Sequence, residues 1–140
     1  MSALETDLNP NTYIGLSLPL KRDNNNNFAL TKNSLQQSQH NLKNLLLTHP
    51  LERVGQPEFG CRLRDICFEP IDADLPKKID EEVRRAVGVW LPYINIKAVN
   101  TLTEDQDQNI VYVEVKYTTT LNPQTLQQIT LDTSYTAERV

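Results

Sequence analysis

The sequence predicts an α+β fold, with two main helices packed on a small antiparallel three-stranded sheet, an extended N-terminal arm and a C-terminal edge strand. Two segments in the first two thirds of the chain carry apolar residues at spacings of three and four, the period of an amphipathic helix. After Pro92 the spacing changes to two, the period of a half-buried strand. The chain has 140 residues, of which 39% are hydrophobic, so it can close one modest core.

The first thirty residues show little periodicity. Pro10 and Pro19 interrupt regular structure, and residues 24–27 form a run of asparagines without a side chain suited to a core. We therefore expect residues 1–30 to form an extended arm with one short strand-like contact, followed by a flexible loop. Residues 31–140 are predicted to form a single α+β domain.

Two helices are predicted in that domain. The first runs from about Asn33 to Leu47, since Asn33 is a plausible N-cap and leucines follow on one face. The second begins after Asp74, with Pro76 in its first turn, and stops before Pro92. Its apolar stripe consists of Ile79, Val83, Ala86, Val87 and Trp90.

Three antiparallel strands are predicted after the second helix. Their alternating apolar residues are Ile94 and Ile96, then Val111, Val113, Val115 and Tyr117, then Leu126, Ile129 and Leu131. We expect the connecting loops at Thr103–Asn109 and Leu121–Thr125. The last strand lies at an edge of the sheet, where unpaired backbone groups must be shielded or used.

Composition excludes several classes of function. The 14 Lys and Arg residues face 18 Asp and Glu residues, giving a net charge of −4, so nucleic acid is not an expected partner. The sequence has neither an apolar run long enough to cross a membrane nor a basic start typical of a secretory signal, so we expect folding in a cytoplasm and no membrane partner. Cys61 and Cys67 lie six residues apart, which fits neither a zinc knuckle nor a redox pair. They are predicted to be reduced and partly buried, and no cofactor or metal is expected.

The segment Leu51–Pro70, here called the connector, holds two of the four glycines and two of the eight prolines. Gly55 and Gly60 permit backbone conformations that a Cβ atom would forbid, while Pro57 and Pro70 fix turns. The connector is therefore predicted to be an ordered loop pinned to the core by Phe59, Leu63, Ile66 and Phe68.

The connector also carries a recognisable motif, made of Glu52, Arg53, Pro57, Glu58, Phe59, Gly60, Leu63, Phe68, Glu69 and Pro70. It resembles the signature of the contractile-tail baseplate wedge family, which includes phage tail-lysozyme-like proteins and type VI secretion wedge subunits. The resemblance covers roughly Tyr13 to Thr133. It implies a structural protein of the virion tail baseplate, assembled in the host cytoplasm, whose partners are other wedge subunits and the tail sheath protein.

Two positions depart from the family pattern. Family members usually carry Gly before the Glu-Arg pair, where this chain has Leu51. The second helix of the family typically ends in Glu-Pro-Arg, the triad that docks on the helical core of the wedge. Here these positions read Leu91, Pro92 and Tyr93. The resemblance implies that this wedge-core contact either keeps its position and becomes apolar, or binds a diverged partner.

The sheath contact is expected at the C-terminal strand and tail. Sheath subunits of contractile tails exchange strands with their neighbours, so the resemblance implies that the first sheath layer needs a template edge. Strand addition supplies affinity through main-chain hydrogen bonds. The candidate contact residues are Gln127, Gln128, Ile129, Thr130, Leu131, Asp132, Thr133 and Tyr135.

An enzymatic alternative is a peptidoglycan-degrading tail lysozyme, because four carboxylates lie close together in the sequence: Glu58, Asp65, Glu69 and Asp72. A glycosidase needs one carboxyl group with a raised pKa, whereas the neighbouring arginines favour ionised carboxylates. His40 and His49 lack a nucleophilic partner in the sequence and are interpreted as surface or helix-end residues. We therefore predict no catalytic residues. A third reading is a scaffold of another secretion-like machine.

Overall fold

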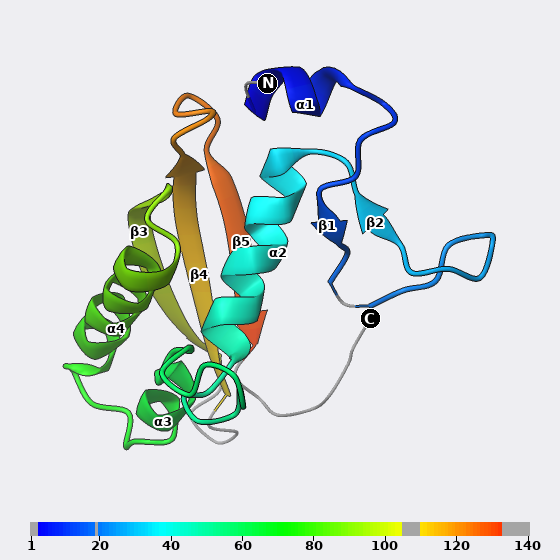
Figure 1. The fold of residues 1–140 in the computed structure, drawn as a ribbon. Coiled ribbons are helices and arrows are strands. Elements are labelled where there is room, and N and C mark those ends of the chain that lie inside the picture. Colours follow the sequence, from blue (N-terminus) through cyan, green and yellow to red (C-terminus); the bar gives the residue numbers. More distant parts are fainter. Residues whose placement is uncertain (1–2, 19, 105–109, 133–140) are drawn as a thin grey trace.

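A computed structural model describes residues 3–18, 20–104 and 110–132. The helices are α1 (Ala3–Leu8), α2 (Ser34–Leu47), α3 (Leu63–Cys67) and α4 (Leu75–Trp90). The strands are β1 (Gly15–Leu16), β2 (Leu30–Thr31), β3 (Ile94–Glu104), β4 (Ile110–Thr119) and β5 (Gln127–Asp132). Figure 1 shows α2 and α4 lying over one face of the β3-β4-β5 sheet. This arrangement is the predicted α+β fold.

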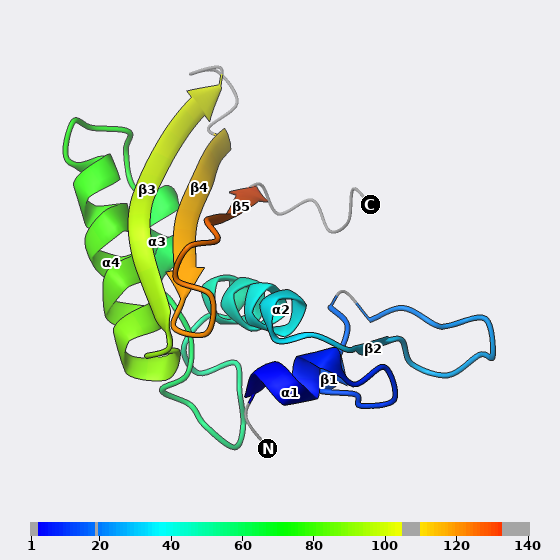
Figure 2. The ribbon, with the colours of Figure 1, turned by 90° about the horizontal axis from the view of Figure 1, so that it is seen from above.

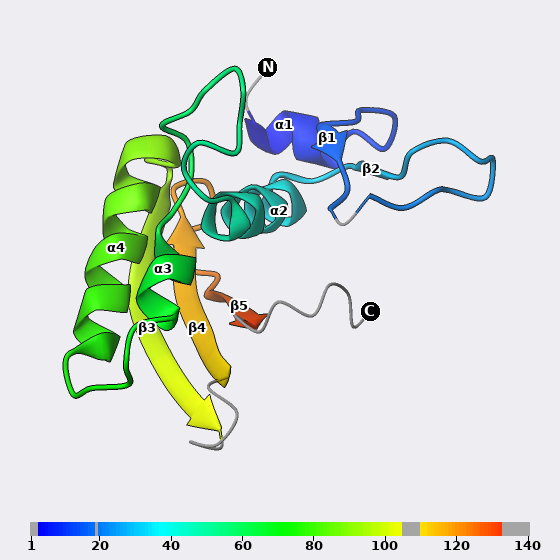
Figure 3. The ribbon, with the colours of Figure 1, turned by 90° about the horizontal axis from the view of Figure 1, so that it is seen from below.

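The main sheet is antiparallel in the order β3-β4-β5. Its central strand places Val115 opposite Val99 on one side and opposite Ile129 on the other, and a register shift occurs between Ile96 and Ala98. Figures 2 and 3 show the sheet from its two ends, with the helices on one side. Side chains on the helical side form the core together with Leu42, Leu45, Leu63, Ile79, Val83 and Val87.

Both main helices form where the sequence predicts them. Asn33 caps α2, because its Oδ1 accepts a hydrogen bond of 2.8 Å from the backbone N–H of Gln36. Helix α4 carries Pro76 in its first turn and ends at Trp90, two residues before Pro92. Among the described residues, no helix is long and apolar enough to cross a membrane.

The strand boundaries correct part of the prediction. Strand β3 continues through Glu104, so Thr103 and Glu104 pair with β4 instead of starting a loop. Leu126 precedes β5, and 56% of its side chain is exposed, so it is not part of the alternating strand. Thr133 and Tyr135, two of the predicted sheath contacts, lie outside the described residues.

The N-terminal arm contains more regular structure than predicted. Helix α1 was not expected, and its Asp7 caps α2: the Asp7 Oδ1 accepts hydrogen bonds of 2.8 Å from both the N–H and the hydroxyl of Ser34. Strands β1 and β2 pair antiparallel and lie beside α2 (Figure 2). We call the described residues 13–18 and 20–32 the N-terminal ribbon.

One predicted core residue is not in the core. Phe68 follows α3 at the surface and is 71% exposed, with the Arg64 guanidinium 6.0 Å from its ring centre. Phe59 and Leu63, by contrast, are buried as predicted. Since α3 has only five residues, it presents one face to the core, and Phe68 lies beyond that face.

Candidate docking surfaces

The connector backbone folds back on the end of α2. The Cys61 N–H donates to the Thr48 carbonyl oxygen at 2.9 Å, and the intervening Gly60 has φ +137°. A Cβ atom on Gly60 would lie 2.5 Å from that same oxygen. Both the conformation and the close approach therefore require glycine, as the sequence suggested.

Leu51 adopts a left-handed backbone conformation, with φ 78°. Its N–H donates to the Pro57 carbonyl oxygen at 2.7 Å, and its side chain is 81% exposed. At the position where the family resemblance implies glycine, this chain thus holds a leucine in a left-handed conformation, at the cost of local strain.

Aromatic packing attaches the connector to α4. The Phe59 ring centre lies 5.2 Å from the Trp90 ring centre in an edge-to-face arrangement, and the Arg53 guanidinium lies 4.4 Å from the Phe59 ring centre. Glu52 steadies the turn before it, since its Oε2 accepts a hydrogen bond of 3.1 Å from the His49 N–H. The remaining motif carboxylates are exposed, and Glu69 pairs with Lys78 at 2.7 Å.

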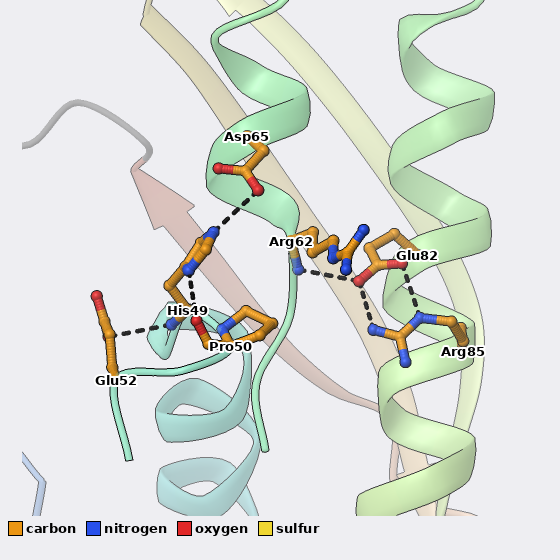
Figure 4. A network of polar contacts seen from close by, with 7 residues as sticks. All are labelled: His49, Pro50, Glu52, Arg62, Asp65, Glu82 and Arg85. Carbon is orange, nitrogen blue, oxygen red and sulfur yellow. Dashed lines mark hydrogen bonds and ion pairs between the residues drawn. The ribbon is translucent and has the colours of Figure 1, made fainter. Parts of the chain in front are cut away.

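A polar network joins the connector to α4 (Figure 4). The Glu82 carboxylate accepts a hydrogen bond of 2.9 Å from the backbone N–H of Arg62 and one of 2.6 Å from the Arg85 guanidinium. The hydrogen bonds from Arg85 hold the pKa of Glu82 below its usual value. Glu82 therefore links the connector to α4 as an ionised carboxylate.

His49 links the end of α2 to α3 (Figure 4). Its Nε2 lies 2.9 Å from Asp65 Oδ2, and its Nδ1 lies 2.7 Å from the Pro50 carbonyl oxygen. Both neighbours are acceptors, so only the doubly protonated imidazolium satisfies both contacts. The hydrogen bond to Asp65 raises the pKa of His49 accordingly. The sequence offered no signal for this pair, because its members are sixteen residues apart on different elements.

These residues border a cleft of about 650 Å³ between the connector and α4. Its carboxylates include Glu58, Asp65 and Glu82, of which Asp65 faces His49 and Glu82 faces Arg85. The Arg85 guanidinium lowers the pKa of Glu82, the opposite of what a glycosidase acid requires. The nearby thiol of Cys61 is equally unsuited to chemistry, because burial raises its pKa to about 12.

The three predicted wedge-core residues after α4 differ in their exposure to solvent. Leu91 is buried in the chain's own core and is 8% exposed. Pro92 is exposed and Tyr93 is half-buried, with its hydroxyl oxygen accepting a hydrogen bond of 3.0 Å from Asn41 Nδ2. Tyr93 also borders a groove of about 340 Å³ between the ribbon, α2 and the loop after β4.

Strand β5 has the alternation of a half-buried edge strand. Ile129 and Leu131 point into the core, whereas Gln128, Thr130 and Asp132 are exposed. Within residues 3–18, 20–104 and 110–132, β5 pairs with β4 along one edge, and its other edge has no strand partner. The main chain from Gln127 to Leu131 thus forms an edge of the sheet that no other described strand pairs with.

Comparison with known proteins identifies the same family as the connector motif. The family described as Baseplate wedge protein gp25 matches residues 33–124. Baseplate wedge protein gp25 of Enterobacteria phage T4 is 31% identical over 100 residues, covering 69% of this chain and 73% of that protein.

Solved structures share the fold. A Geobacter sulfurreducens protein described as a tail lysozyme superposes with a TM-score of 0.63 at 24% identity, over 74% of this chain and 94% of that one. A chain of the anti-feeding prophage baseplate superposes with a TM-score of 0.59 at 18% identity, over 84% of this chain and 81% of that one. A chain of the type VI secretion baseplate superposes with a TM-score of 0.52 at 14% identity, over 70% of this chain and 90% of that one. The family match spans most of the chain and includes the connector, so this protein belongs to the baseplate wedge protein gp25 family of contractile tails.

Proposed function

We propose that the protein is a non-enzymatic baseplate subunit that docks on the wedge core at the end of α4 and templates the first layer of tail sheath along β5. It would act in the virion tail baseplate after assembly in the host cytoplasm. The observation that carries the proposal is the one-sided pairing of β5 within the described part of the chain.

The sheath side rests on the geometry of β5. An added strand gains main-chain hydrogen bonds at the open edge, and the alternation of buried and exposed residues sets its register. The burial of Ile129 and Leu131 anchors β5 to the core, so the template edge is held in place. Residues 133–140, which the proposal includes in the sheath contact, lie outside the described residues.

The wedge side uses Pro92 and Tyr93 as contact residues. Leu91 has a different role in this proposal, because its burial fixes the turn from which they project. The contacts of Phe59 with Trp90 and with Arg53 support this end of α4 from the connector side. The contact is therefore built on a rigid base, with apolar and aromatic surface in place of the family's charged triad.

The non-enzymatic reading rests on the carboxylates. Asp65, Glu69 and Glu82 each lie within ion-pair distance of a cation of this chain. An acid catalyst for glycoside cleavage must hold its proton near neutral pH, and the hydrogen bonds from Arg85 lower the pKa of Glu82. The lysozyme description of the Geobacter protein therefore does not transfer to this chain on site chemistry.

The test is a pull-down of the purified tail sheath protein, with electron microscopy of any tubes formed. The full-length chain is compared with a chain ending at Asp132 and with the variant Thr130→Lys, which places a charge on an exposed position of β5. Asn95→Lys is the matched control, because it adds the same charge at an exposed position of β3, the other edge strand.

Tube nucleation by the full chain and by Asn95→Lys, but not by the truncated chain or Thr130→Lys, supports the template edge. Equal nucleation by all four chains would sink it. A turbidity assay on purified cell walls tests the enzymatic alternative, and we expect no clearing.

A further inference from the structure

The N-terminal ribbon exposes apolar side chains that nothing in the described structure covers. Leu16 and Leu30 face each other across the two strands and are 46% and 44% exposed. Phe28, two residues before Leu30 and bridged to Arg22, is 58% exposed. Tyr13 and Leu20 add further exposed apolar surface. Clusters of this kind on a soluble protein mark interaction sites.

The ribbon is seated on α2 by its other, small-residue side. Thr31 is fully buried, and a Cβ atom on Gly15 would lie 2.6 Å from Gln37 Oε1 of α2. The Thr31 hydroxyl bonds both the Gly15 carbonyl oxygen and the Gln37 side chain. The apolar residues therefore face away from the domain, and a hairpin with two residues per strand has no means of burying them itself.

Charge on the ribbon is opposite to that of the whole chain. Lys21, Arg22 and Lys32 border the apolar residues, and the single carboxylate, Asp23, accepts hydrogen bonds of 2.9 Å from the N–H groups of Asn25 and Asn27. Three cations and one anion give the ribbon +2, so the remainder of a chain of net −4 carries −6. A partner for this surface needs apolar area with negative charge around it.

The three carboxylates of α4 are already engaged within this chain, in the ion pairs Lys77–Glu81, Asp80–Arg84 and Glu82–Arg85. The family to which the chain belongs places it beside other baseplate subunits, so we place the complementary carboxylates on one of them. The ribbon also precedes residues 33–124, the part that matches the gp25 family, so it adds a surface beyond the matched domain.

We propose that the N-terminal ribbon docks, through Leu16, Phe28 and Leu30, into an apolar groove rimmed by carboxylates on another subunit of the same baseplate. The apolar face supplies the buried area, and Lys21 and Lys32 pair with the rim. This contact rests on membership of the baseplate and is independent of the proposed sheath contact at β5.

Photo-cross-linking in the assembled baseplate identifies the occupant. Phe28 is replaced by p-benzoylphenylalanine, a substitution that its exposure tolerates, and the cross-linked peptides are read by mass spectrometry. We expect a cross-link to another baseplate subunit, at an apolar segment with Asp or Glu on both sides. The same probe at Val89, 62% exposed on α4, is the positional control and is expected to give a different peptide or none. A Phe28 cross-link to a second copy of this chain, to a basic segment, or to nothing would overturn the proposal.

Affinity measurements with the cross-linked subunit, purified, test the chemistry. The double variant Lys21→Glu/Lys32→Glu should bind roughly tenfold or more weakly at low salt, with the difference shrinking as salt is added. The matched control Lys77→Glu/Lys97→Glu makes the same change of charge at two exposed positions outside the ribbon. Leu16→Thr/Leu30→Thr, which places strand-favouring β-branched residues in the two strands, should also lower the affinity roughly tenfold.

Thermal melting of each variant separates lost binding from lost folding. Unchanged affinity of both ribbon variants would overturn the proposal. The sheath assay separates the two proposals, because a ribbon variant is expected to lose the baseplate contact while it still nucleates sheath tubes, whereas Thr130→Lys is expected to do the reverse.

Discussion

The close contact at Gly60 predicts a large penalty for the smallest possible change, Gly60→Ala. Its φ of +137° lies where side chains are disfavoured, which costs about 1–3 kcal/mol. The added Cβ would lie 2.5 Å from the Thr48 oxygen, 2.8 Å from the Pro50 nitrogen and 2.9 Å from the His49 carbonyl carbon, all backbone atoms. Relieving this overlap displaces the backbone at Thr48 and breaks the hydrogen bond that the Cys61 N–H donates to the Thr48 oxygen. Such a bond contributes about 1 kcal/mol to stability.

These effects add to about 2–4 kcal/mol of lost unfolding free energy, or a fall in Tm of roughly 10 °C for a chain of this size. Urea unfolding followed by circular dichroism measures it. Gly55→Ala is the matched control, since a Cβ there meets nothing within 4 Å, and it should change stability by less than about 1 kcal/mol. A Gly60→Ala variant within about 0.5 kcal/mol of the wild type would refute this account of the connector backbone.

Three further predictions use the same unfolding assay. Leu51→Gly should stabilise by about 0.5–1 kcal/mol, because it relieves a left-handed conformation at an exposed position, and a loss of stability would contradict this. Phe59→Ala should cost about 3–5 kcal/mol and Phe68→Ala less than about 1 kcal/mol, since only Phe59 is buried; similar losses would be inconsistent with their packing. His49 has a raised pKa, so its contribution is fully present below about pH 6.5 and is lost as pH rises through the folded pKa. His49→Gln should therefore flatten the fall in stability from mildly acidic to alkaline pH, and an unchanged profile would exclude the imidazolium bridge to Asp65.

Long periodic segments were predictable from the sequence. Helices α2 and α4 repeat their apolar residues over several turns and carry clear end signals, Asn33 and Pro76. The alternation of Val111, Val113 and Val115 likewise defined β4. Such elements are specified locally, because each needs one continuous face against the core.

Tertiary contacts decide the parts that the sequence did not predict. Helix α1 has six residues, and its Asp7 meets Ser34 at a separation of 27 residues, which no local pattern reveals. Phe68 resembles a core residue by type, yet the short α3 leaves it outside. For the candidate contacts, the sequence located the end of α4 and β5, but it could not show that Leu91 faces inward or that His49 meets Asp65.

Helix α2 contacts β5 on one side and β2 on the other. Its 14 residues make a rod about 21 Å long, stiffened by caps from Asn33 and Asp7 at its N-terminus. The proposed ribbon contact and the proposed sheath contact are therefore connected through one helix, α2. If both contacts form, a pull on β5 during tail contraction is carried through α2 to the neighbouring subunit that holds the ribbon. The mechanical load then bypasses the connector, whose strained turns are the least suited to bear it.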